Sequence, residues 1–420
     1  KGGETMEINY DEPEGLMGIL LAFEGVKDAE TILNGPTGCK FHPSSVSESV
    51  YRRKGSFNPM VFSGEFHFCQ PRIPCTYLGG YDYITGSKDR LNRLFEEISS
   101  SNPRLIGIVN SPGASLIGES LNVSETSIPV VKIETPAYSR SMGEGFQEGL
   151  MSILEKIKPS GTKRKGCINL LGISVWHLNW EDSINDLSAL LNLCGIEVIS
   201  SAGAGWSVDD ILSSGEAELN VIIHDEFGSK VGNWYKENCN IPFISPEVPI
   251  GFDALESWLK EICSILGKDA APALEVIRSK RKKVYRELLA MDERKALPKG
   301  RTFSIAADGS LAFPILRFLY EYLGMVPVAV NVEDQEWNRV IGEYLSNKGL
   351  TASENVSNTV ADIFIGDGNT LSSLLFRDIV RSGIVVESPG IRQIEIRDEP
   401  VLGLNGTLRL LDGVLNSLIR

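Results

Sequence analysis

Apolar residues follow two different spacings along this chain. Short continuous apolar runs, typical of buried strands, occupy residues 29–33, 105–109, 129–133, 167–172, 195–199, 219–224, 325–330, 362–367 and 384–387, and residues 300–309 indicate a strand followed by a turn. Apolar residues spaced three or four positions apart, typical of amphipathic helices, occupy residues 14–30, 88–99, 182–193, 207–213, 311–323 and 335–347 and the carboxyl end. The alternation of the two patterns predicts strand–helix units with parallel strands.

The order of these units predicts an α/β fold of three doubly wound, Rossmann-like domains with parallel sheets around a central cleft. We place the first domain at residues 1–160, the second at 161–268 and the third, which ends in an apolar helix, at 299–420. Residues 269–298 form a long charged stretch between them, which predicts a solvated bridging helix over 270–297. The cleft between three such domains is a natural ligand cavity.

The composition narrows the possible functions. A net charge of −14 argues against nonspecific binding of nucleic acid or of an anionic membrane surface. No apolar run reaches the length of a membrane span, and the beginning of the chain lacks a signal-peptide pattern. Seven cysteines scattered over 420 residues do not suggest a disulfide framework. We therefore expect a cytoplasmic protein with no membrane partner.

Three of the seven cysteines fall between residues 34 and 86. Cys39, Cys69 and Cys75 lie near glycine or proline, which predicts that each is held on a loop and not inside a helix. Loop thiolates with nearby backbone N–H groups suit an iron–sulfur cluster. The spacing fits neither a zinc ribbon nor a compact ferredoxin run. The alternative is three small buried apolar side chains.

Three of the four histidines are candidates for proton delivery. His42 follows Cys39 by three residues, His224 ends an apolar run, and His177 lies between Trp176 and Trp180. Each histidine could instead be a structural residue with a hydrogen-bond partner. The tryptophans, Trp176 in particular, could line an amphipathic ligand such as a planar macrocycle, or could belong to a lid packed on its own domain.

Several segments resemble the nitrogenase component 1 family and its relatives. Residues 35–39 read Gly-Pro-Thr-Gly-Cys and are similar to the loop whose cysteine binds the electron-receiving cluster in that family. Residues 71–86 resemble the segment that follows the loop in the family, and residues 135–145, 239–254 and 400–407 resemble later family segments. At Ser111 the chain departs from the family, which has a third cluster-ligating cysteine there. In nitrogenase itself a cysteine anchors the catalytic metallocluster near the position of His224.

The resemblance implies a reductase that receives electrons through an iron–sulfur cluster, expected to be [4Fe-4S]. It implies Cys39 as a ligand, with Cys75 slightly preferred to Cys69 as the next, Gly38 and Ser111 beside the cluster, and Trp176 beside the substrate. His42, His177 and His224 would deliver protons. Among the relatives, the tetrapyrrole-reducing members are closest to this chain in size.

The same resemblance implies two kinds of partner. One is a second copy of the chain or a paralogous subunit. The other is an ATPase with its own iron–sulfur cluster, so ATP would act only through that partner; the chain itself has no Gly-Lys-Ser or Gly-Lys-Thr phosphate loop. Two alternatives stay open: a scaffold or non-catalytic subunit for assembling a metallocofactor, and an α/β protein that binds a small ligand or metal.

Overall fold

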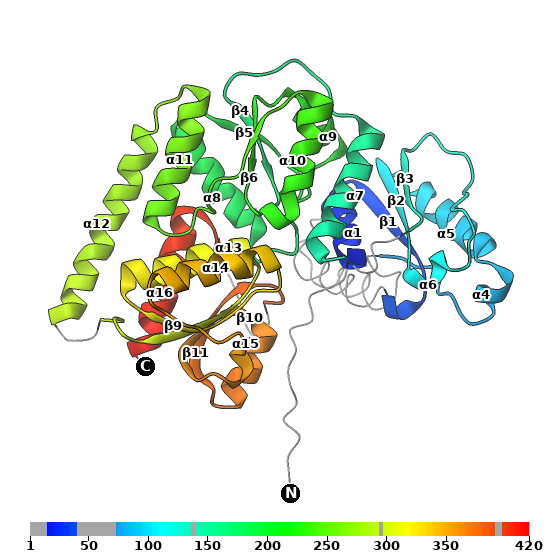
Figure 1. The fold of residues 1–420 in the computed structure, drawn as a ribbon. Helices are drawn as coiled ribbons and strands as arrows, with labels where there is room; N and C mark the ends of the chain where they lie inside the picture. The colour runs from blue at the N-terminus through cyan, green and yellow to red at the C-terminus, as the bar shows by residue number, and fades with distance from the viewer. Residues whose placement is uncertain (1–14, 40–72, 136–139, 294–296, 391–396, 420) are drawn as a thin grey trace, which may run out of the picture. The chain divides into compact units, whose positions relative to one another are not determined.

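The computed structural model describes residues 15–39, 73–135, 140–293, 297–390 and 397–419. His42 and Cys69 lie outside these residues. The chain divides into two compact units (Figure 1). Of the described residues, one unit contains those from Gly15 to Trp176 and from Val198 to Ser245, and the other contains those from His177 to Glu197 and from Pro246 to Ile419.

The first unit holds two parallel sheets. The first sheet has the order β1-β2-β3, and the second has the order β5-β4-β6-β7. The strands are β1 (Ala29–Asn34), β2 (Leu105–Asn110), β3 (Val130–Ile133), β4 (Cys167–Leu171), β5 (Glu197–Ser201), β6 (Leu219–Ile222) and β7 (Phe243–Ile244). The helices are α1 (Gly15–Glu24), α4 (Asp82–Thr85), α5 (Lys88–Ser100), α6 (Pro112–Ser115), α7 (Met142–Ile157), α9 (Val208–Ser213) and α10 (Asp225–Cys239), with a 3-10 turn at Ser214–Glu216.

The second unit holds the third parallel sheet, with the order β11-β10-β8-β9. Its strands are β8 (Thr302–Ala306), β9 (Val326–Asn331), β10 (Ala361–Asp367) and β11 (Val380–Glu387). Its helices are α8 (Trp180–Leu193), α11 (Phe252–Leu266), α12 (Ala271–Glu293), α13 (Gly309–Arg317), α14 (Gln335–Asn347), α15 (Gly368–Phe376) and α16 (Gly403–Ile419), with a π-turn at Phe318–Tyr322 and a 3-10 turn at Val356–Asn358.

The three parallel sheets confirm the predicted fold class. The proposed domain boundaries stay a prediction. The inner strands of the three sheets are almost wholly buried, as the continuous apolar runs indicated: every residue of β2, β4 and β6 is buried, and β8 and β10 each have one residue that is only partly buried. Parallel strands need both faces covered, so their sequences lack the polar alternation of a half-exposed sheet.

Several predicted elements differ in extent from the observed ones; for example, the strand predicted over 384–387 begins at Val380, and the one predicted over 195–199 is observed at Glu197–Ser201. The helix predicted over 14–30 ends at Glu24, and the strand predicted over 219–224 ends at Ile222, so that His224 becomes the residue before α10. The helix predicted over 311–323 becomes α13 followed by the π-turn, in which Phe318 stacks on Tyr322 with ring centroids 5.1 Å apart. In that turn Phe318 also packs against Gly251, where a side chain would meet its ring.

Candidate functional site

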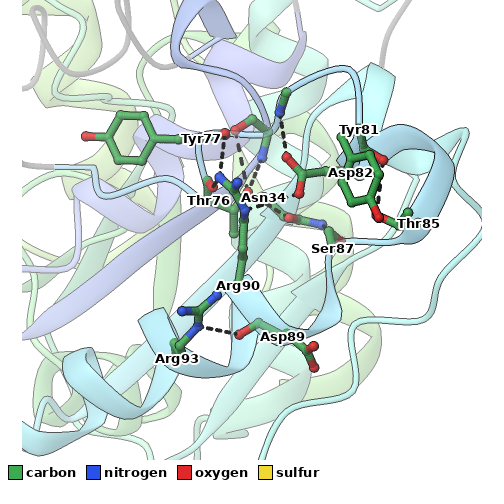
Figure 2. Close-up of polar contacts among 12 residues, drawn as sticks. Asn34, Thr76, Tyr77, Tyr81, Asp82, Thr85, Ser87, Asp89, Arg90 and Arg93 are labelled. Carbon is green, nitrogen blue, oxygen red and sulfur yellow. Dashed lines mark hydrogen bonds and ion pairs between the residues drawn. The ribbon is translucent and has the colours of Figure 1, made fainter.

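Two parallel strands of the first sheet end side by side in asparagine. Asn34 of β1 is the register partner of Asn110 of β2, and its Nδ2 donates to Asn110 Oδ1 at 2.9 Å. Thr76 Oγ1 donates to Asn34 Oδ1 at 2.9 Å and accepts from Gly35 N at 3.0 Å (Figure 2). The Asn34 amide also reaches Ser87 Oγ at 3.3 Å. Because all these groups are buried, the network fixes the loop that leads from β1 to Cys39.

Cys39 lies in a helical turn over residues 37–39 that follows this loop. The neighbouring glycine and proline residues predicted that Cys39 lies on a loop and not in a helix. This prediction is wrong, because Cys39 lies in a short helical turn. Pro36 directly precedes the turn, and Cys39 N donates to Pro36 O at 3.3 Å. The Cys39 side chain is partly exposed. A side chain at Gly38 would meet no described atom within 4 Å, so packing does not require glycine there.

Cys75 lies beside the end of β1. It forms a parallel bridge with Leu33, in which Leu33 N donates to Pro74 O at 3.0 Å and Thr76 N donates to Leu33 O at 3.1 Å. The Cys75 side chain is only 2% exposed. The segments that carry Cys39 and Cys75 are therefore neighbours at the carboxyl edge of the first sheet, where ligand loops are expected.

Ser111 joins the same edge from β2. Its N–H donates to Asn34 O at 2.8 Å, and its Oγ accepts from Ala114 N at 3.2 Å as the cap of the short helix α6. A Cβ on Gly35 would lie 2.6 Å from Ser111 Oγ, so the loop needs a glycine at that point. Ser111 thus lies next to the loop that leads to Cys39, and its side chain caps α6.

Tyr83 is a candidate that the sequence reading missed. Burial, the nearby Cys39 thiolate and Asp82 together raise the pKa of Tyr83. Its hydroxyl oxygen lies 2.9 Å from the position of a Cβ on Gly113, in the turn after Ser111. Tyr83 therefore lies between the Cys39 turn and α6. Nothing in its local sequence pattern signals this position, because the three contacting segments are far apart in the chain.

The described residues contain no group of three histidine, cysteine or carboxylate side chains arranged to hold a metal ion. Two predicted residues, His42 and Cys69, lie outside the residues that the structure describes. None of the six cysteines in the described ranges forms a disulfide.

His177 and Trp176 lie at the start of the segment before α8, and both are buried. His177 belongs to the second unit, where its Nε2 lies 3.8 Å from Asp308 Oδ2 in the turn after β8. Burial lowers the pKa of His177 to about 3, so the imidazole is neutral at physiological pH. The roles predicted for both residues stay predictions.

The lowered pKa of His177 should make folding stability depend on pH. An unfolded histidine titrates near 6.5, so the stabilising contribution of the neutral imidazole is complete above that pH and falls as the pH drops toward 3. Between pH 7 and pH 5 we expect the free energy of unfolding to fall by about 2 kcal/mol from this group. Urea unfolding of the wild type and His177→Gln at both pH values measures the difference, and equal slopes in the two proteins would contradict it.

His224 lies in the first unit at the carboxyl edge of the second sheet. It is buried and precedes α10 without a side-chain capping bond. Gly172, which follows β4, has φ +84, and a side chain there would fall on the His224 carbonyl oxygen. Gly172 thus allows the backbone after β4 to approach the His224 backbone closely. His177 and His224 belong to different units, so the structure gives no distance between them.

Comparison with known proteins gives consistent matches. The family model described as nitrogenase component 1 type oxidoreductase matches residues 15–419. A subunit of the light-independent protochlorophyllide reductase from Synechococcus sp. (strain WH7803) is 30% identical over 259 residues, which cover 58% of this chain and 47% of the relative. The corresponding protein from Prochlorococcus marinus (strain NATL1A) is 24% identical over 437 residues, which cover 98% of this chain and 78% of the relative.

This chain spans about half the length of the protochlorophyllide reductase relatives that match at about 30% identity. Among solved structures, nitrogenase Cp1 at pH 6.5 superposes with a TM-score of 0.77 and 15% sequence identity, covering 100% of this chain and 94% of that one. At that identity the superposition shows a shared fold. Within the described residues, none of the helices has both the length and the apolar character needed to cross a bilayer.

Proposed function

Because the chain belongs to the nitrogenase component 1 type oxidoreductase family, we propose that it is the electron-accepting component of a reductase whose partner is an ATP-dependent iron–sulfur protein. The observation that carries this proposal is the meeting of the Cys39 turn, the Cys75 segment and Ser111 at one edge of the first sheet. A paired copy of the chain, or a paralogous subunit, would complete the component.

The residues present fit one side of an iron–sulfur site. Cys39 and Cys75 would supply two thiolates, and the network around Asn34 would keep their segments in place. Two thiolates are fewer than the four that a [4Fe-4S] cluster takes, so a partner subunit, alone or together with Cys69, would supply the other two. When bound, the cluster would accept electrons one at a time. Ser111, whose hydroxyl caps α6, would line the site.

A group of exposed apolar side chains lies next to this site. We call it the edge patch; it consists of Tyr77, Tyr81, Tyr83, Ile84 and Leu116. Ile84 is 85% exposed and Leu116 is 87% exposed. The segment that carries Tyr77 to Ile84 and the segment that carries Leu116 lie together, since Tyr83 covers Gly113 and Ser87 N donates to Glu119 Oε2 at 2.6 Å. Figure 2 shows Tyr77 and Tyr81 on the loops that surround the Asn34 network.

The edge patch suits the docking of the reductase partner. Contiguous exposed apolar side chains mark interaction sites, and tyrosine is enriched in them. Residues 77–93 and 111–119, which carry the patch, hold three basic and three acidic side chains, whereas the whole chain has a net charge of −14. A partner can therefore approach the patch without strong repulsion. Electrons delivered there would arrive beside Cys39.

Charging the edge patch should weaken the coupling to the partner. For Ile84→Glu and Leu116→Glu we expect the concentration of ATPase partner needed for half-maximal turnover to rise at least about tenfold, with iron content unchanged. The matched control is Phe376→Glu in α15, since Phe376 is 90% exposed in the second unit. The measurement is a titration with an ATP-dependent iron–sulfur reductase from the same source. If the variants change only the oligomeric state, the patch is a subunit interface and not the docking site.

We propose a tetrapyrrole as the substrate. The support is the similarity to the light-independent protochlorophyllide reductase proteins. Trp176 would contribute an amphipathic wall, and His224 would be a proton donor. His177, whose imidazole is neutral at physiological pH, would take up a proton before it donates one. His42 keeps the same proposed role.

A second candidate function is a scaffold, or a non-catalytic subunit, for metallocofactor assembly. Ser111 favours it, because a capping hydroxyl replaces the thiolate that the family carries at this position. Anaerobic purification distinguishes the candidates. A reductase should be brown, contain about one four-iron cluster per dimer, and turn over with the ATPase partner and reductant. A scaffold should transfer its cluster to another protein without turnover, and a colourless protein without iron would exclude both.

A further inference from the structure

The contact between His177 and Asp308 has a geometry that a chance surface contact would lack. Both side chains are nearly buried, with exposed fractions of 8% for His177 and 11% for Asp308, and Nε2 lies 3.8 Å from Oδ2. That distance is longer than a hydrogen bond and too short for an intervening water molecule. The carboxylate therefore faces one specific ring nitrogen directly.

The Asp308 side is held by the third sheet. Asp308 N donates to Glu387 Oε1 at 2.6 Å, which ties the turn after β8 to the end of β11. The next residue, Gly309, lies against the Trp337 indole, where any side chain would clash. Asp308 precedes α13 without a side-chain capping bond to that helix. Backbone contacts thus hold the turn that carries the carboxylate, and the carboxylate makes no capping bond to α13.

The His177 side is also held within the second unit. Two residues later, Asn179 adopts a left-handed conformation with φ +50, and its Nδ2 donates to Glu399 O at 2.7 Å. The intervening Leu178 packs against Gly390, where a Cβ would lie 2.9 Å from Leu178 Cδ1. Both members of the contact are therefore on fixed backbone, so the carboxylate can select one orientation and tautomer of the imidazole.

We propose that Asp308 is a positioning residue that keeps the proton of neutral His177 on Nε2, facing the carboxylate, and leaves Nδ1 as an acceptor. The carboxylate attracts the N–H group and repels a lone pair, so it favours the Nε2–H tautomer. Only the part of the inference that gives His177 a role in proton delivery rests on the proposed function. The tautomer itself is a property of the chain alone.

Nitrogen-15 NMR of histidine-labelled protein tests the inference, since the chain has four histidines and His177→Gln assigns the signal. Wild-type His177 should be the Nε2–H tautomer, and Asp308→Ala should change the ratio of the two tautomers about tenfold toward Nδ1–H. Asp308→Asn, which keeps one acceptor oxygen, should give an intermediate ratio of the two tautomers. This variant provides the test if the alanine variant does not fold. A wild-type Nδ1–H tautomer, or an unchanged ratio in the variants, would overturn the inference.

Asp367→Ala is the matched control. Asp367 stands at the start of α15, and its Oδ1 accepts from Asn369 N and Thr370 N at 2.8 and 3.0 Å. Its removal should lower the midpoint of unfolding and leave the His177 signal unchanged, whereas a change in that signal would show that Asp308 acts only through general stability. If Asp308→Ala shifts the tautomer but leaves kcat unchanged, the positioning stands and the proton-delivery role of His177 fails.

Discussion

Cys39→Ala should remove most of the bound iron and lower turnover with the ATPase partner by more than about 100-fold. The reason is that a thiolate ligand of a cluster has no substitute in alanine, and the loss of supporting residues alone costs metal sites 10–100-fold. The anaerobically purified variant would be assayed for iron and sulfide and for reduction of the substrate. The Asn34 network does not involve the Cys39 side chain, so we expect the variant to fold.

The matched control for this variant is Cys239→Ala. Cys239 is also partly exposed and lies in the same unit, at the end of α10, with its Sγ 3.9 Å from Pro159 O. Burial raises the pKa of Cys239, which disfavours the thiolate that iron requires. Cys239→Ala should therefore keep its iron. If both variants keep wild-type iron and turnover, Cys39 is not a ligand and the proposed redox function is wrong.

The fold could be predicted from the sequence where one local signal dominated. The helix predicted over 335–347 matches α14, because its amphipathic spacing follows Asp334, whose side chain accepts from Trp337 N at 2.9 Å. The ends of helices and strands that no local signal marks could not be predicted. The strand before His224 ends at Ile222, although the apolar run continues through Ile223.

The candidate site shows the same division. A motif places Cys39 and Ser111 at strand ends, and parallel strands bring such ends to one edge of a sheet. The sequence cannot show that Thr76 joins Asn34, or that Asp308 faces His177, because these contacts depend on how distant segments pack. It also cannot show that the Ser111 hydroxyl caps α6, since capping depends on the backbone direction at that residue.

Helix α1 shows how small residues alter a prediction. The sequence indicates one apolar stripe, formed by Leu16, Ile19, Leu20 and Phe23. All ten residues of α1 are buried, including the glycines on its other side. The reason is a close approach to α7, in which a side chain at Gly18 would fall on the Met142 carbonyl oxygen and one at Gly145 would fall on the Gly15 carbonyl oxygen. An amphipathic pattern alone does not reveal such a contact.

This approach predicts a large loss of stability for Gly145→Ala. The added methyl group would meet the Gly15 backbone of a helix that is buried on every side, so α1 or α7 would have to move as a whole. Overpacking a core costs about 1–3 kcal/mol, and more where backbone must shift, so we expect the free energy of unfolding to fall by about 3 kcal/mol or more. Urea unfolding followed by circular dichroism measures the change.

Gly342→Ala in α14 makes the same chemical change without the contact, since a side chain there would meet nothing within 4 Å. In an exposed helix, alanine is preferred to glycine by about 1 kcal/mol, so this variant should be slightly more stable than the wild type. Relative to the wild type, Gly145→Ala should therefore lower the free energy of unfolding and Gly342→Ala should raise it. Gly18→Ala pushes on the same helix pair, so its effect should not add fully to that of Gly145→Ala. If Gly145→Ala unfolds at the wild-type urea concentration, α1 and α7 do not pack as closely as the glycine positions require.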